Sequence, residues 1–178
     1  MLKSHMPRSH GHDGAVLKGI AAGLAGGLVA SYVMNQFQAV TRKVADSGKG
    51  RRKRKKKKED GEDATVRTAE AITEAFGHRL TKQEKQVAGP AVHYAFGATM
   101  GGVYGALAEL SPKLAAGGGL PFGTALWLAA DEVAVPALGL GKKPAETPAP
   151  LHAYALASHA VYGLTAEIVR RAVRRALH

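Results

Sequence analysis

Apolar residues gather in four stretches of the chain, and polar or charged segments separate them. With their flanking residues, these stretches cover about 15–38, 88–110, 116–139 and 150–171. Each is close to the ~20 residues that a helix needs to cross the hydrocarbon of a bilayer. The pattern predicts an all-α fold, in which residues 1–178 form a single membrane domain with four transmembrane helices.

Glycine spacing in the first two stretches favours this membrane fold over a soluble Ala-rich helical bundle. In water, each interior glycine costs about 1 kcal/mol relative to alanine, so six would cost roughly as much as the whole stability of a small domain. In lipid, the same rows let two helix backbones approach closely. We therefore predict Gly-rich packing faces on the first two spans. The rows are Gly19, Gly23 and Gly27, followed by Ser31, and Gly97, Gly101 and Gly105.

A secretory signal peptide is the alternative interpretation of the first apolar stretch. Its end, Val29-Ala30-Ser31, is a poor small-residue cleavage site. We therefore treat this stretch as a membrane span.

The segment at 41–62 is charged and low in complexity, and we expect a disordered basic loop. It contains an unbroken run of Lys and Arg at 51–58, within a chain whose formal net charge is +11. The run has no interleaved aromatic residues to stack on bases, so we expect no specific nucleic-acid partner. Anionic lipid headgroups are the expected partner of this polybasic loop, and a merely solvated loop is the alternative.

A short amphipathic helix is predicted at 64–77, with Gly77 as its C-cap. Thr81 and Glu84 have the spacing of a capping box, so the next helix should begin there. The apolar face of the short helix consists of Val66, Ala69, Ile72 and Phe76.

Four spans place both termini on one side of the membrane and the basic loop on the other. Lys and Arg are more numerous on the loop side, so the positive-inside rule predicts a cytoplasmic loop and external termini. Four arginines directly flank the last span, which keeps a cytoplasmic C-terminus open as the alternative. We expect these four to contact lipid headgroups: Arg170, Arg171, Arg174 and Arg175.

Ionisable residues inside the predicted spans are the candidates for function. Asp131 and Glu132 lie well inside the third span, where an ionised carboxylate costs about 3 kcal/mol, so we expect protonation, pairing or a polar cavity. His93, Asp131 and His159 fall toward the loop side and, with Glu132 nearby, form a predicted intramembrane polar site. The secondary candidates are Glu109, His152 and Glu167.

Three roles for this site stay open. Two imidazoles and one carboxylate at His93, Asp131 and His159 suit a divalent metal ion. They equally suit a proton relay, because imidazoles titrate near neutral pH. Alternatively, the groups form structural hydrogen bonds between helices. The identity of any cofactor is therefore unknown, a divalent metal being the candidate.

Enzyme chemistry has no support in the sequence. The chain contains no cysteine, and it lacks the phosphate-binding glycine loops, the His-Glu-x-x-His zinc motif and the Gly-x-Ser-x-Gly nucleophile motif. We expect no enzymatic activity.

From His93 onward, about half of the chain resembles the YagU-type family of bacterial inner-membrane proteins, a family defined as a domain of unknown function. In that family, a histidine stands where this chain has Asp131, so the exchange keeps a proton or metal ligand and changes its charge. The resemblance implies a multi-pass location in the bacterial inner (plasma) membrane and no established activity. It is carried by His93, Gly101, Tyr104, Glu109-Leu110-Ser111-Pro112-Lys113, Pro136, Gly139-Leu140, His159 and Glu167-Ile168-Val169-Arg170-Arg171.

Together these features favour an integral membrane protein whose spans enclose a small polar site for proton or cation handling. The alternative is a structural or scaffolding membrane protein, with glycine faces that pack helices or join a homo-oligomer and a basic loop that engages anionic lipid. A soluble, basic, nucleic-acid-binding helical protein is a third class. Alkaline carbonate extraction distinguishes these classes, because it would release a soluble protein from membranes and leave an integral membrane protein behind.

Overall fold

The structure, a computed structural model, describes residues 10–47 and 63–177, and these residues contain helices and no strand. The all-α fold class is therefore confirmed. The elements are α1 (His10–Ser47), α3 (Ala64–Ala75), α4 (Lys82–Leu110), η1 (Pro112–Ala115), α5 (Leu120–Trp127), η2 (Leu128–Ala134), α6 (Val135–Ala137), η3 (Pro144–Glu146) and α7 (Ala149–Ala176).

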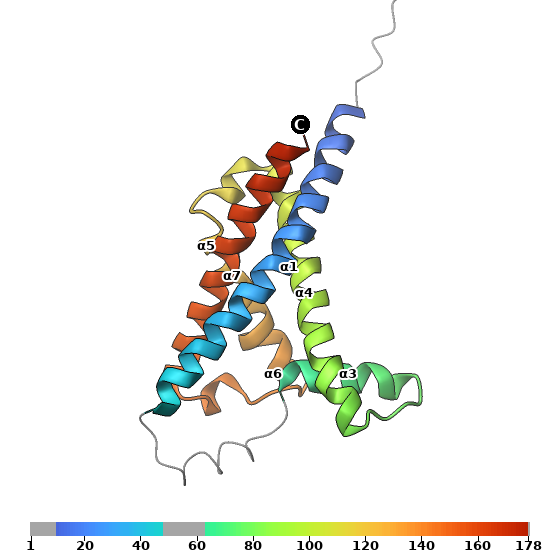
Figure 1. Cartoon of the computed structure of the whole chain (residues 1–178), viewed down its shortest axis with the longest axis vertical. Helices are drawn as coiled ribbons and strands as arrows, with labels where there is room; N and C mark the ends of the chain where they lie inside the picture. The colour runs from blue at the N-terminus through green and yellow to red at the C-terminus, as the bar shows by residue number, and fades with distance from the viewer. Residues whose placement is uncertain (1–9, 48–62, 178) are drawn as a thin grey trace, which may run out of the picture.

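Three long helices, α1, α4 and α7, form the body of the molecule, and α1 packs against both of the others (Figure 1). The segment α5–η2–α6 is continuous and lies along α7. The start of α1, η1 and the end of α7 lie at one end of the bundle, which we call the terminal end (Figure 1). The opposite end, called the loop end, holds the last turn of α1, α3 and η3.

The glycine rows of α1 and α4 lie directly against each other. A Cβ added at Gly23 would overlap the carbonyl oxygen of Gly101, and one added at Gly101 would overlap the carbonyl oxygen of Gly23. One turn away, a Cβ added at Gly27 would overlap the carbonyl oxygen of Gly97, whereas one added at Gly97 would overlap the hydroxyl of Ser31; at the other end of the rows, Gly105 meets the first glycine of the α1 row. Any larger side chain on these rows would push the two backbones apart.

A second contact between small residues joins α5 to α7, and the sequence analysis did not predict it. A Cβ added at Gly123 would overlap the carbonyl oxygen of His159, and one at Gly163 would overlap that of Gly119. Gly26 of α1 packs in the same way on the backbone of Ala166 in α7. Gly119 and Gly123 have the four-residue spacing of the other rows, but Gly26 and Gly163 have no glycine partner at this spacing, so the pattern reveals only part of these contacts.

The interior consists mainly of small and polar side chains. Few large side chains are fully buried, and they include Tyr104 and Glu167. Tyr162 is 2% exposed, and its hydroxyl donates a hydrogen bond to the carbonyl oxygen of Gly97, which ties α7 to α4 at mid-height. Most of the long apolar side chains point outward instead.

The predicted capping box at the start of α4 is confirmed. The Thr81 amide donates to Glu84 Oε2 at 2.7 Å, and the Glu84 amide donates to Thr81 Oγ1 at 3.3 Å. The first of these bonds stabilises the ionised carboxylate and lowers the pKa of Glu84. The short predicted helix at 64–77 corresponds to α3, which ends at Ala75.

Two predicted boundaries are wrong. Residues 41–47 continue α1 as helix instead of starting a disordered loop, because Thr41 and Arg42 bond back to the preceding turn. The remainder of the predicted loop, including the basic run at 51–58, lies outside the described residues. The predicted third span begins too early at 116, because Gly117 to Gly119 have positive φ values of 66–87° and helix α5 starts at Leu120.

Membrane-spanning character is found in one of the described helices. The segment Asp13–Ser47 of α1 is long enough to cross a bilayer and contains an 18-residue window with a mean hydropathy of 1.6. Core helices and signal sequences can share these properties.

The glycine contact predicts opposite outcomes for two Gly→Ala substitutions within α1. Gly23→Ala should destabilise the protein by about 1–3 kcal/mol, because its methyl group overlaps the α4 backbone. Gly14→Ala should leave stability unchanged or raise it by up to about 1 kcal/mol, because nothing lies within 4 Å of the added Cβ and alanine favours helix. Thermal unfolding of both purified variants, followed by circular dichroism, would measure this. Equal melting temperatures would show that the α1–α4 contact is looser than described.

Candidate functional site

The third helical segment widens into a π-helical turn, η2, at the point where it carries Asp131 and Glu132. The amide of Val135 donates to the carbonyl oxygen of Ala130, five residues earlier. Pro136 has no amide hydrogen and cannot bond to the carbonyl four residues before it, so an α-helical pattern is interrupted here. Single π turns inside helices occur frequently at functional sites. This turn presents two adjacent carboxylates to α7.

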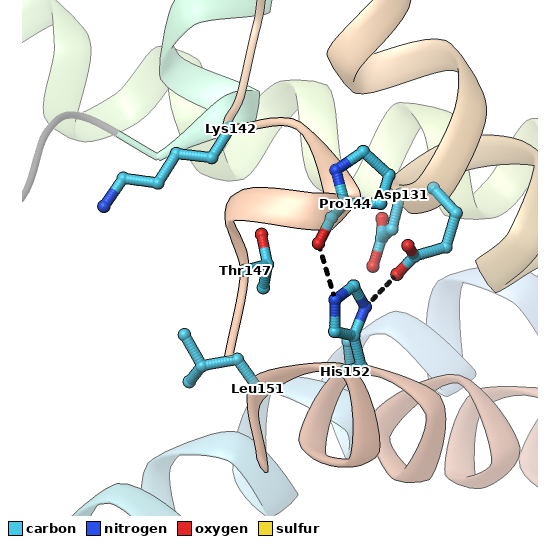
Figure 2. A pocket seen from close by; sticks show the side chains of 8 residues that line it. Asp131, Lys142, Pro144, Thr147, Leu151 and His152 are labelled. Carbon is cyan, nitrogen blue, oxygen red and sulfur yellow. Dashed lines mark hydrogen bonds and ion pairs between the residues drawn. The ribbon is translucent and has the colours of Figure 1, made fainter. Parts of the chain in front are cut away.

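Glu132 and His152 form the shortest carboxylate–imidazole contact described at the loop end. His152 Nδ1 lies 2.6 Å from Glu132 Oε1, and its Nε2 lies 3.1 Å from the carbonyl oxygen of Pro144 (Figure 2). A carbonyl oxygen only accepts hydrogen bonds, so Nε2 carries a proton. The Nδ1 atom then either donates to an ionised Glu132 or accepts from a protonated one. The pair therefore holds one proton between its two members.

Asp131 faces the next histidine of α7. Its Oδ2 lies 3.7 Å from Nδ1 of His159, which is within ion-pair range and too long for a hydrogen bond. His159 is 8% exposed, and the same Nδ1 lies 3.0 Å from the carbonyl oxygen of Ala155. Because that carbonyl needs a donor, Nδ1 of His159 carries a proton.

A small cavity opens beside these pairs. Its volume is about 200 Å³, enough for several waters that occupy about 30 Å³ each in the liquid. His152 extends from α7 into the space below Pro144, while the side chain of Lys142 points away from it (Figure 2). The lining residues are Asp131, Glu132, Lys142, Pro144, Thr147, Leu151, His152 and Ala155.

The predicted three-residue metal site is not formed. Within residues 10–47 and 63–177, no three metal-ligating side chains come together. His93 packs edge-on against the ring of Tyr94, and its buried Nε2 has no hydrogen-bond partner. The pairing of Asp131 with His159 thus does not extend to a second imidazole. His152, predicted as secondary, makes the shortest contact of the site.

A second charged cluster closes the terminal end. Glu167 is 2% exposed and accepts hydrogen bonds from Arg170, at 2.7 and 3.0 Å, and from Arg171. Arg174 donates to Glu109 of α4 at 2.8 Å. The guanidinium of Arg170 also lies 5.8 Å from the centre of a buried tyrosine ring on α4. These contacts fix α7 to α4 through charge-assisted bonds.

The expectation that four arginines contact headgroups is wrong for Arg170, and for Arg174 it stays a prediction. Arg170 is buried, and both pair with carboxylates, because an interior carboxylate without a cationic partner would be costly. Arg171 and Arg175 are exposed and keep the predicted orientation toward the surroundings. The i,i+3 spacing from Glu167 to Arg170 could have indicated one of these pairs, although the sequence analysis did not predict it. The Glu109–Arg174 pair joins residues 65 positions apart and left no sequence signal.

A family model described as "Protein of unknown function (DUF1440)" matches residues 68–168. The chain belongs to this family. The match includes both carboxylate–imidazole pairs and Glu109, and it ends one residue after Glu167. Comparisons with curated proteins and with solved structures gave no significant match. Membership of this family assigns no activity, and the YagU-type identity stays a prediction.

The terminal cluster of this family member should be sensitive to loss of one carboxylate. Glu167→Gln should destabilise the protein by about 3–5 kcal/mol, because it removes the nearest charge partner of the buried Arg170 and leaves it only Glu109, at 3.8 Å. The control Glu74→Gln, in an exposed pair with Arg79 at 3.6 Å, should cost no more than about 1 kcal/mol. Denaturant unfolding of both variants would compare them. A Glu167→Gln variant as stable as the control would contradict the network.

Proposed function

We propose that this protein is a four-span helical membrane protein that accepts and releases protons at the carboxylate–imidazole pairs of its loop end. Its proposed location is the bacterial inner membrane, with the loop end toward the cytoplasm. The observation that carries the membrane assignment is the position of the large apolar side chains, which face outward around the bundle.

These outward-facing residues occur on every long helical segment. Soluble monomers rarely expose apolar surface on this scale, whereas hydrocarbon is the natural surrounding for it. Beneath them lie glycine, alanine, serine and paired charges, a combination that suits close helix packing in lipid. Examples, with exposures of 38–67%, are Leu24, Leu28 and Val29 on α1, Phe96, Val103 and Leu107 on α4, Leu120 and Leu128 along α5–η2, and Leu164 and Ile168 on α7.

The carboxylates within the bundle support the same placement. An unpaired ionised carboxylate at the bilayer centre costs about 3 kcal/mol, so membrane proteins pair such groups or face them to cavities. Asp131 and Glu132 each meet a histidine of α7. Glu109 and Glu167 each meet arginines. Each of the four therefore has a basic partner within the bundle.

Proton handling is the chemistry that the loop-end pairs support best. Glu132 and His152 share one proton beside a water-sized cavity, so the pair can exchange it with solution. Asp131 is adjacent in sequence and also lines the cavity, and its partner His159 is buried deeper in the bundle. A proton taken up at the first pair therefore has a second acceptor nearby.

A structural membrane role is the second candidate. It is favoured by the terminal cluster, in which arginines keep their charge at all physiological pH values and bind two helices together. The glycine rows of α1 and α4 pack against each other within one chain. Any homo-oligomer must therefore use other faces, such as the outward apolar surface.

Membrane placement predicts which positions are shielded from water. The chain contains no cysteine, so single-cysteine variants at Leu28, Val103 and Ile168 report one position each. In vesicles, all three should react slowly with a water-soluble maleimide and should remain membrane-bound in alkaline carbonate. Glu74→Cys, on the exposed face of α3, is the reactive control. Fast labelling of Leu28→Cys in intact vesicles would contradict a membrane span at α1.

Proton handling predicts a loss of flux on neutralising one carboxylate. Wild-type protein in sealed vesicles should speed the decay of an imposed pH gradient. Glu132→Gln should slow this decay on the order of 100-fold, the contribution typical of a positioned proton acceptor. Glu74→Gln should behave as wild type. Equal rates for empty and protein-containing vesicles would favour the structural role, and decay that requires an added metal cation would favour cation handling.

A further inference from the structure

Helix α3 runs across the loop end of the bundle, crossing the direction of α4 (Figure 1). One side of it is fastened to α4. Lys85 Nζ lies 2.5 Å from Glu70 Oε1, and Ala69 is 4% exposed. The side chain of Val66 fills the space beside Gly89, where a Cβ would approach it to 2.7 Å. This helix therefore has a fixed position at the rim of the bundle.

The other side of α3 is apolar and uncovered. Phe76 is 86% exposed and Ile72 51% exposed, and Leu138, just after α6, is 71% exposed. Between α3 and the residues after α6 lies a groove of about 480 Å³, lined by Thr68, Ala71, Ile72, Ala75, Phe76, Leu138 and Leu140.

The lining of this groove selects an apolar ligand. Thr68 is its one side chain with a polar group, and the Thr68 hydroxyl already donates to the carbonyl oxygen of Ala64 at 2.8 Å. The Thr68 oxygen can still accept a hydrogen bond, but the lining offers no charged side chain and no other polar side chain. The energy of binding must therefore come from burial of apolar surface, at about 25 cal/mol per Å².

The surroundings of the groove indicate lipid. Leu138 continues the outward apolar surface of the third segment, on which Val133 is 62% exposed, so the groove opens from the surface that we assign to hydrocarbon. Lys142 and Lys143 follow Leu140 by two and three residues and are exposed. Their positive charge at the rim complements anionic headgroups of the cytoplasmic leaflet. A helix with one apolar face, lying across the end of a bundle, is typical of an interfacial segment.

We propose that the groove between α3 and Leu138–Leu140 holds an acyl chain of an anionic phospholipid, with α3 lying at the boundary between headgroups and hydrocarbon. This inference rests on the membrane placement proposed above. It does not depend on proton handling.

The test uses depth-dependent fluorescence quenching in vesicles of mixed anionic and zwitterionic phospholipid. Single cysteines at Phe76, Glu74 and Leu28 each carry one small fluorophore in the otherwise full-length chain. The lipids carry a nitroxide either near the headgroup end or near the methyl end of an acyl chain. The label at Phe76→Cys should be quenched at least twofold more by the headgroup-end nitroxide than the label at Glu74→Cys, on the opposite face of α3. The label at Leu28→Cys should respond more to the methyl-end nitroxide.

A variant in which a side chain fills the groove distinguishes lipid bound within the groove from lipid that only contacts the surface of the protein. Ala71→Phe places a ring in the groove and should reduce quenching of a label at Leu138→Cys by about half or more. The same change should leave quenching at Leu28→Cys unaltered. Unchanged quenching at Leu138→Cys would overturn the acyl-chain site.

The remaining outcomes are distinct from each other. If Leu28→Cys is quenched and Phe76→Cys matches Glu74→Cys, the inference fails and membrane placement stands. If Phe76→Cys is shielded from both lipid nitroxides and aqueous iodide, a protein surface covers the groove, and the inference also fails. If Leu28→Cys is not quenched by either lipid, the proposed membrane placement itself is wrong.

Discussion

The close approach of α1 to α4 is the contact on which the rest of the structure depends. Gly23 and Gly101 bring the two backbones so near that neither position has room for a methyl group. With α4 held there, the other side of α1 is free for α7, where Gly26 meets Ala166. The two ends of α7 are thereby placed opposite the carboxylates of α4 and of the π turn. A wider α1–α4 spacing would move Glu109 of α4 away from Arg174 of α7.

The carboxylates at the two ends of the bundle are paired with different basic side chains. This difference decides which chemistry each end can support. Glu167 pairs with guanidinium groups, which keep their protons at all physiological pH values, so the terminal end is electrically fixed. Glu132 pairs with His152, whose charge can change near neutral pH, beside a cavity that admits water. Between the two ends, the Tyr162 hydroxyl joins α7 to α4 by a hydrogen bond to the α4 backbone. The terminal end therefore holds helices together, and the loop end carries the groups on which the proposed proton exchange rests.

The features that could be predicted from sequence are those encoded by short spacings. Three such features are the glycine rows, the Thr81–Glu84 capping box and helix α3. Each depends on residues only a few positions apart, so the local sequence pattern reveals it. The pairing of Asp131 with His159 was also predicted. The partner of Glu132 was not, because choosing His152 requires the path of η3, which brings the Pro144 carbonyl to the other side of that imidazole. Contacts between distant segments, such as Arg174 with Glu109, depend on how far each helix is rotated about its axis, which no short spacing fixes.

The π turn also determines how the two carboxylates are divided between the histidines. Neighbouring residues of a helix point about 100° apart, yet Asp131 and Glu132 both reach α7, where His152 and His159 are two turns apart. The widened turn allows this because it holds one residue more than an α-helical turn of the same height. Losing a single residue there would return the segment to a regular helix and leave α7 one acidic neighbour instead of two. The chain length between Leu128 and Ala134 thus sets how many carboxylates of this segment pair with the histidines of α7.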